Sequence, residues 1–179
     1  MYDKMNNKTL KFLLSTALIV LVIMSRFLPH PPNFTAALSV GIFAGFLFKN
    51  KAFGYIIPII AMIASDLFIG MHSTIWAVYT SILIAGLIGA NIKKSNPGNI
   101  ALSSFISAVI FFLITNLAVW LNGIMYPMNI AGLTSCYISA IPFFGYTLLS
   151  TIVYSFILFE IYKLFEKYIF SKEINNQLN

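Results

Sequence analysis

The chain has 179 residues, of which 59% are hydrophobic and 9% are charged, and its net charge is +6. Soluble globular proteins carry about 25% charged residues, so this composition excludes a soluble globule and predicts an all-α integral membrane protein. The basic residues stand singly or in pairs between apolar runs, with no basic face interleaved with aromatic residues, so we expect no nucleic-acid partner.

Six apolar runs are candidate transmembrane helices, because a helix of about 20 residues crosses about 30 Å of hydrocarbon. The second run is short for a span. In it, Ala37, Gly41 and Gly45 recur every four residues, which indicates close packing against another helix. The six predicted runs cover residues 10–28, 35–48, 52–70, 74–92, 100–121 and 141–165.

Turn-forming residues separate these runs. Proline lacks a backbone N–H and fixes its own φ, so the cluster Pro29, Pro31 and Pro32 should end the first helix. Residues 93–98 predict a turn. Residues 122–139 contain glycine and proline but no charge, and we predict that they form the longest weakly structured segment. The first apolar run is not followed by a small-residue cleavage site, so we expect it to stay part of the protein and not to be a cleaved signal peptide.

The basic residues predict the orientation of the spans. With six spans, ten of the eleven basic residues fall on one side, which should be cytoplasmic, and Arg26 alone falls on the other. This arrangement predicts a cytoplasmic tail at 1–9, one six-helix transmembrane domain at 10–170 and a polar cytoplasmic tail at 171–179. The ten are Lys4, Lys8, Lys11, Lys49, Lys51, Lys93, Lys94, Lys163, Lys167 and Lys172.

The same topology gathers polar and aromatic side chains at the outer ends of the spans. Arg26 stays charged, so it needs water, a lipid phosphate or a carboxylate beside it, and Asp66 is the candidate carboxylate. Such a pair could either tie helix one to helix three or frame a pocket. The candidate substrate-binding residues are Arg26, His30, Asn33, Asp66, His72, Trp76, Thr115, Asn116, Trp120 and Tyr137.

Asn116 lies on one helical stripe with Phe112 and Trp120, so its amide should sit between two aromatic surfaces that could hold a flat, partly polar ring. A structural interpretation stays open for each of these residues. Thr115 and Asn116 could hydrogen-bond to neighbouring helices, and Trp76 and Trp120 could be interfacial anchors. The two histidines could be ordinary loop residues.

The sequence gives no positive indication of catalysis. His30, His72, Asp66 and Cys136 match no metal-binding spacing, and no nucleophile–base pair is visible, so we expect no metal, no cofactor and no enzymatic activity. The single cysteine excludes an internal disulfide. The chain has no glycine loop with a lysine to bind phosphates, so any ATP would be hydrolysed by a partner.

Several motifs together resemble an uncharacterised family of small bacterial membrane proteins. They are RFLPHPPNFT at 26–35, SDLFIGMH at 65–72, FFLITNLAVW at 111–120, GLTSCY at 132–137 and AIPFF at 140–144. That family is grouped with the substrate-binding S components of energy-coupling-factor vitamin transporters.

The resemblance implies an S-component-like bundle of six helices in the bacterial inner membrane, with both termini cytoplasmic. Such a protein captures a small, vitamin-like micronutrient at its outer face. Its other expected partners are membrane lipids and an energising membrane subunit with ATPases. The alternative is an accessory or assembly subunit without a ligand of its own, whose small-residue stripes contact partner helices.

Overall fold

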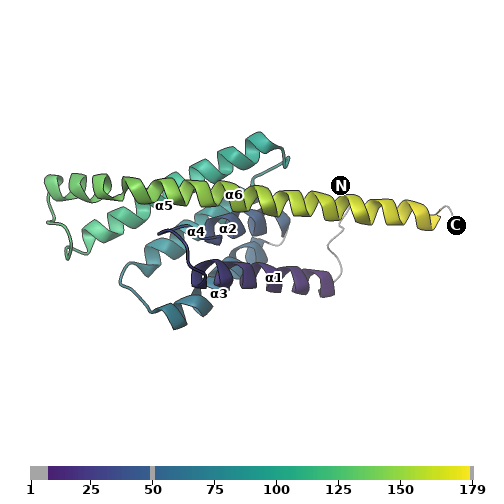
Figure 1. Ribbon diagram of the computed structural model, residues 1–179, viewed down its shortest axis with the longest axis horizontal. Coiled ribbons are helices and arrows are strands. Elements are labelled where there is room, and N and C mark those ends of the chain that lie inside the picture. The colour runs from purple at the N-terminus through teal and green to yellow at the C-terminus, as the bar shows by residue number, and fades with distance from the viewer. Residues whose placement is uncertain (1–7, 49–50, 178–179) are drawn as a thin grey trace.

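The computed structural model describes residues 8–48 and 51–177, and all the regular secondary structure in these ranges is helical (Figure 1). The predicted all-α class is confirmed. Residues 1–7, 49–50 and 178–179 lie outside the described residues, and with them the predicted cytoplasmic residues Lys4 and Lys49. The six helices are α1 (Lys8–Phe27), α2 (Ala37–Leu47), α3 (Lys51–Ile69), α4 (Ile75–Ala90), α5 (Pro97–Leu121) and α6 (Ile130–Gln177).

Three of these helices are long and apolar enough to cross a membrane, which is typical of an integral membrane protein. They are the segments Ala52–Ile69, Pro97–Leu121 and Ile130–Lys167. The other three described helices are apolar but shorter.

The outward face of α3 shows the character expected next to lipid. From residue 53 to residue 67 its exposed large side chains recur three or four residues apart and are all apolar, whereas Ile57, Ala61 and Ser65 on the opposite face are buried. An apolar stripe exposed on this scale is unfavourable in water and favourable in hydrocarbon. The stripe consists of Phe53, Ile56, Ile60, Ile63 and Leu67.

Helix α2 forms the centre of the bundle. Ten of its eleven residues are buried, and it contacts all five other helices. At 1.5 Å per residue the helix is about 16 Å long, so it is too short to cross the hydrocarbon layer unaided. Its predicted role in packing is confirmed.

Glycine residues bring α2 and α4 close together. A Cβ atom added to Gly41 would lie 3.1 Å from the carbonyl oxygen of Ile82. At Gly45 it would overlap the backbone of Gly86, and at Gly89 it would overlap the backbone of Ile42. The small-residue stripe seen in the sequence is therefore used within the bundle.

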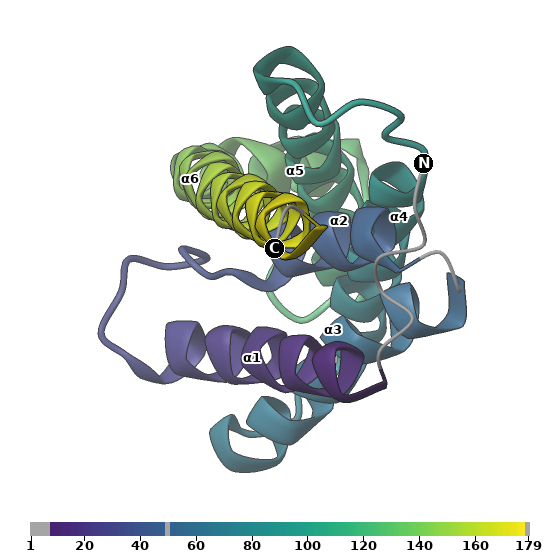
Figure 2. The ribbon, with the colours of Figure 1, turned by 90° about the vertical axis from the view of Figure 1, so that its right-hand side faces the viewer.

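The chain runs back and forth along the bundle, so its connections gather at two ends. In Figure 1 the connections 28–36, 70–74 and 122–129 lie towards the left, while the start of α1 and the end of α6 lie towards the right. Figure 2, viewed along the bundle, shows α1 beside α3 and apart from α6. Helix α1 packs against α3 and more sparsely against α2, and it contacts neither α5 nor α6 in the described part of the chain.

The first connection is held against α1. Helix α1 ends at Phe27, two residues before Pro29, as the proline cluster predicts. The hydroxyl oxygen of Ser25 accepts a hydrogen bond from the backbone N–H of Ala36 at 3.0 Å, which ties the far end of the connection to the helix. Asn33 adopts a φ of +63°, a left-handed conformation that asparagine tolerates better than most residues.

The sixth helix differs from the prediction. It begins at Ile130 instead of 141 and continues to Gln177, so the irregular segment shrinks from 122–139 to 122–129. The Asn129 side chain accepts a hydrogen bond from the N–H of Gly132 at 2.8 Å and caps the new start. Pro142 lies inside the helix, where membrane helices tolerate proline because neighbouring groups satisfy the freed backbone carbonyl.

The contact between α2 and α4 predicts a sharp difference between two glycine substitutions. Gly89→Ala should lower the free energy of unfolding by at least about 2 kcal/mol, because the new methyl group overlaps backbone that cannot move aside. Gly145→Ala is the matched control, since nothing lies within 4 Å of its added Cβ, and it should leave stability unchanged or raise it by up to about 1 kcal/mol. Thermal unfolding in detergent measures both, and equal stability of the two variants would contradict this helix packing.

Candidate functional site

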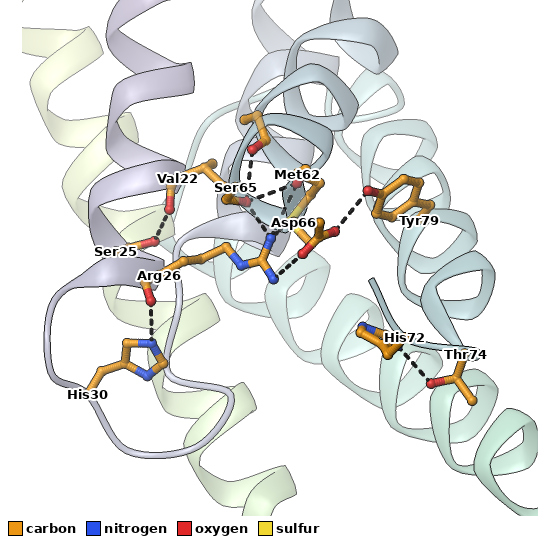
Figure 3. A network of polar contacts seen from close by, with 11 residues as sticks. Val22, Ser25, Arg26, His30, Met62, Ser65, Asp66, His72, Thr74 and Tyr79 are labelled. Atoms are coloured by element: carbon orange, nitrogen blue, oxygen red, sulfur yellow. Dashed lines mark hydrogen bonds and ion pairs between the residues drawn. The ribbon is translucent and has the colours of Figure 1, made fainter. Parts of the chain in front are cut away.

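An ion pair joins three helices at the end of the bundle that carries the connections 28–36 and 70–74. The Nη2 atom of Arg26 on α1 lies 2.5 Å from Oδ1 of Asp66 on α3, whose side chain is 1% exposed. The hydroxyl of Tyr79 on α4 donates a hydrogen bond to Oδ2 of the same carboxylate at 2.8 Å. Figure 3 shows Arg26 and Tyr79 approaching Asp66 from opposite sides. The candidate partnership of Arg26 and Asp66 is thus present in the structure.

The second amino group of Arg26 is also engaged within the protein. Its Nη1 atom donates to the hydroxyl of Ser65 and lies 3.4 Å from the carbonyl oxygen of Met62 (Figure 3). Burying a charge pair is costly unless the remaining donors and acceptors find partners. Here Nη1 of Arg26 and Oδ2 of Asp66 have hydrogen-bond partners, while Oδ1 contacts only Nη2 of Arg26 in the ion pair. The opposite charges make the pair electrically neutral as a unit.

Two cavities adjoin one another beside this ion pair. One has a volume of about 260 Å³ and the other about 280 Å³. We call the first the aromatic lobe, after Phe111, Phe112, Phe143 and Phe144 in its wall, and the second the arginine lobe, after Arg26. Five residues line both lobes and mark where they meet: Asn33, His72, Val78, Phe111 and Thr147.

The aromatic lobe lies mainly between α5 and α6. Its polar side chains Thr115 and Asn116 come from α5. The ring of Phe112 packs against Phe144 on α6 with centroids 5.1 Å apart and against Tyr137 at 5.5 Å. These aromatic contacts hold the wall of the lobe in place.

The arginine lobe is enclosed by more elements of the chain. Arg26 and His30 come from the end of α1 and the connection after it, and Thr35 follows them. Ser150 and Thr151 project from the opposite side, on α6. This lobe therefore spans the space between α1 and α6, two helices that do not touch each other in the described part of the chain.

The structure gathers six of the ten sequence-predicted residues around the lobes. Asp66 does not line either lobe, because it is buried behind Arg26. Trp76 is 53% exposed and lies outside both linings, as an interfacial anchor would. The six that line a lobe are Arg26, His30, Asn33, His72, Thr115 and Asn116.

The other two predicted residues have structural contacts instead. The indole N–H of Trp120 donates to the carbonyl oxygen of Pro127 at 3.1 Å and so braces the connection between α5 and α6. The hydroxyl of Tyr137 donates to the carbonyl oxygen of Leu113 at 2.7 Å, which joins α6 to α5. Tyr137 supports the aromatic lobe from behind, through Phe112.

Sequence reasoning missed a polar cluster on α6. Thr147, Ser150 and Thr151 line the lobes and are buried within an otherwise apolar helix. Their spacing of three and four residues places them on one helical face, and this spacing was the signal that could have identified them. By contrast, no residue of the segment 122–139, all of which is described, lines either lobe.

The described side chains include no group of three or more His, Cys, Asp and Glu residues that could hold a metal ion. Cys136 is buried, and its Sγ lies 3.4 Å from the carbonyl oxygen of Asn116. What the site offers is binding chemistry: neutral polar groups and aromatic rings around a cavity.

Fold and site together define a helical protein of membrane type with a partly open cavity near one end, lined by polar and aromatic side chains. The chain belongs to a family of unknown function, DUF6580, whose match covers residues 6–173. No curated protein and no solved structure matches the chain.

The ion pair predicts an asymmetry between single and double substitutions. Asp66→Asn and Arg26→Gln should each destabilise the protein by about 3 kcal/mol, because each leaves a buried group without its partner. The double variant should lose less than the sum of the two, since no lone charge remains. Thermal unfolding of the three variants gives the coupling energy.

Lys163→Gln provides the control, because the pair of Lys163 with Glu160 lies on the surface at 2.6 Å and its loss should cost less than about 0.5 kcal/mol. Strictly additive effects of the two buried substitutions would contradict the assigned pairing.

Proposed function

We propose that this protein is a membrane-embedded capture or transport subunit that binds a small, vitamin-like micronutrient in the two lobes, at the outer face of the bacterial inner membrane. The observation that supports it most directly is the pair of adjoining cavities lined by neutral polar side chains and phenylalanine rings. Small-molecule sites combine a mostly apolar wall with a few placed polar groups in this way.

The size of the site suits such a ligand. The lobes have volumes of about 260 and 280 Å³, and only together do they reach the range of about 300 to 1,000 Å³ that is common for small-molecule and cofactor sites. Because the lobes adjoin, a ligand can place a flat ring among Phe111, Phe112 and Phe144 and extend a polar group towards His30 and Thr151.

In this proposal all six helices cross the membrane, and both termini are cytoplasmic. The lysine-rich connections then lie inside, as the positive-inside rule requires, while the lobes open towards the exterior. Helix α2 is short, but its neighbours surround it, so its ends need no contact with hydrocarbon. The domain covers 10–170, with cytoplasmic tails at 1–9 and 171–179.

In the proposed function the protein binds its ligand and leaves it chemically unchanged. Uptake against a gradient then needs an external source of energy, which an energising membrane subunit with ATPases would provide. The S-component-like motifs at 26–35, 65–72 and 111–120 support this partnership by resemblance.

The alternative, an accessory subunit without a ligand, depended on small-residue stripes that contact partner helices. The stripe with Gly41 and Gly45 instead packs against α4 inside the bundle, together with Gly89. A stripe already covered by its own protein is not free for a partner, so this finding favours ligand capture.

Native mass spectrometry of the gently extracted protein tests the proposal. We expect a co-purified small molecule of defined mass, bound to the wild-type protein. Asn116→Leu should reduce the bound fraction, with affinity falling about tenfold, because the replacement keeps the volume and removes the amide from the aromatic lobe.

Asn91→Leu is the matched control for this variant. Asn91 and Asn116 make the same hydrogen bond, each from Nδ2 to the carbonyl oxygen four residues earlier at 2.8 Å, but Asn91 lies at the opposite end of α4 from the lobes. It should retain the ligand. No bound molecule in the wild type, and no thermal stabilisation across a panel of vitamins, would contradict the proposed function.

A further inference from the structure

We propose that the lobes select an uncharged aromatic ligand that donates hydrogen bonds, such as a primary aromatic amide, and that they discriminate against anions. This inference deepens the proposed function and rests on it. Three features of the lining carry it: the direction of its hydrogen bonds, the neutralised arginine and the phenylalanine wall.

Four of the five hydroxyl groups in the lining, all except that of Thr35, can act only as acceptors towards a ligand. Thr115, Thr147, Ser150 and Thr151 each donate the hydroxyl proton to a backbone carbonyl oxygen three or four residues earlier, at 2.7 to 3.0 Å. A hydroxyl group has one proton, so in each case the oxygen can only accept a further hydrogen bond. Four hydroxyl oxygens of the site can therefore accept hydrogen bonds from N–H or O–H groups of the ligand.

The amide of Asn116 leaves this bias unchanged. Its Nδ2 atom donates one of its two N–H groups to the carbonyl oxygen of Phe112 at 2.8 Å, which leaves one N–H and the acceptor Oδ1 for a ligand. Asn33 and His72, where the lobes meet, can donate or accept. The polar lining as a whole therefore contains more available acceptors than donors.

Arg26 does not offset this bias with a free positive charge. It is the only Asp, Glu, Lys or Arg among the lining residues, and its guanidinium is bound to Asp66 and Ser65. A carboxylate ligand would bring acceptor oxygens and a negative charge to a site that has acceptors and no unpaired cation. A cationic ligand would find no free carboxylate, because Asp66 is buried and paired.

The remaining surface favours a planar ring. Phe111, Phe112, Phe143 and Phe144 line the aromatic lobe, and ring faces and edges pack well against another flat π-system. Polar acceptors then lie next to that ring position, on Thr115 and Thr147. An aromatic ring that carries a neutral NH₂ group satisfies both parts of the lining.

Matched probes test this inference on the purified full-length protein. Benzamide, benzoate and benzamidinium share one shape and differ in charge, while N,N-dimethylbenzamide is neutral but has no N–H donor. Dissociation constants from ligand-observed NMR titration should be lowest for benzamide, by about tenfold or more over each of the others. Asn116→Leu should weaken benzamide binding and Asn91→Leu should not. This difference distinguishes binding in the lobes from partitioning of benzamide into the detergent micelle.

The outcomes separate the two proposals. If benzoate or benzamidinium binds as tightly as benzamide at a site sensitive to Asn116→Leu, the charge selectivity is wrong while ligand capture stands. Equal binding of N,N-dimethylbenzamide would overturn the donor requirement. If no probe binds but native mass spectrometry finds a ligand, the inferred ligand class is wrong and the proposed function survives.

One substitution should weaken the preference for benzamide over benzoate. Asp66→Asn removes the negative partner of Arg26 and leaves an uncompensated positive charge beside the arginine lobe, so the affinity for benzoate relative to benzamide should rise about tenfold. Tyr79→Phe is the control, because it removes a hydrogen bond to Asp66 and keeps the ion pair, and it should preserve the wild-type order. An unchanged ratio of the benzoate and benzamide affinities in folded Asp66→Asn would contradict the assigned role of the pair. Should this variant fail to fold, the wild-type titrations decide the charge selectivity.

Discussion

The ion pair of Arg26 and Asp66 is the interaction on which the arrangement of the site depends. Helix α1 packs mainly against α3, so this pair and its hydrogen bond to Tyr79 link α1 to α3 and α4 at the end where the lobes lie. The same contacts neutralise Arg26, which is the only Asp, Glu, Lys or Arg residue in the lining of the two lobes. A single network therefore fixes the position of α1 and sets the electrostatic character of the cavity beside it.

The remaining walls are placed by the buried helix α2. Because α2 contacts every other helix and meets α4 at glycine residues, the long helices α5 and α6 pack around a fixed centre. The arginine lobe lies between α1 and α6, which do not contact each other in the described part of the chain, and Ser150 and Thr151 line it from α6. The short, buried helix α2 thus organises the packing in the middle of the bundle and positions the helices whose polar side chains line the lobes near its end.

Local signals in the sequence predicted much of this organisation. Composition indicated helices, the proline cluster indicated the end of α1, and the cost of an unpaired charge pointed from Arg26 to Asp66. The start of α6 was missed because glycine and proline near residue 130 outweighed the capping potential of Asn129, and because proline breaks helices in water more reliably than in lipid.

Which side chains face a cavity was harder to predict, because helix rotation is set by packing between distant segments. Trp120 and Tyr137 are residue types that often contact ligands, but here they donate hydrogen bonds that stabilise the packing of α5, α6 and the connection between them. Thr147 is a single polar residue in an apolar run, which by itself predicts no site, yet it lies where both lobes meet.

The central claim is that the end of the bundle that carries the lobes faces the exterior, and the accessibility of single cysteines tests it most directly. In a Cys136→Ala background, His30→Cys and Lys94→Cys place one thiol at each end of the bundle. A membrane-impermeant maleimide applied to intact cells should label position 30, and it should label position 94 only after the membrane is permeabilised. Labelling of both positions from the same side would contradict the proposed orientation and, with it, capture of a ligand from outside.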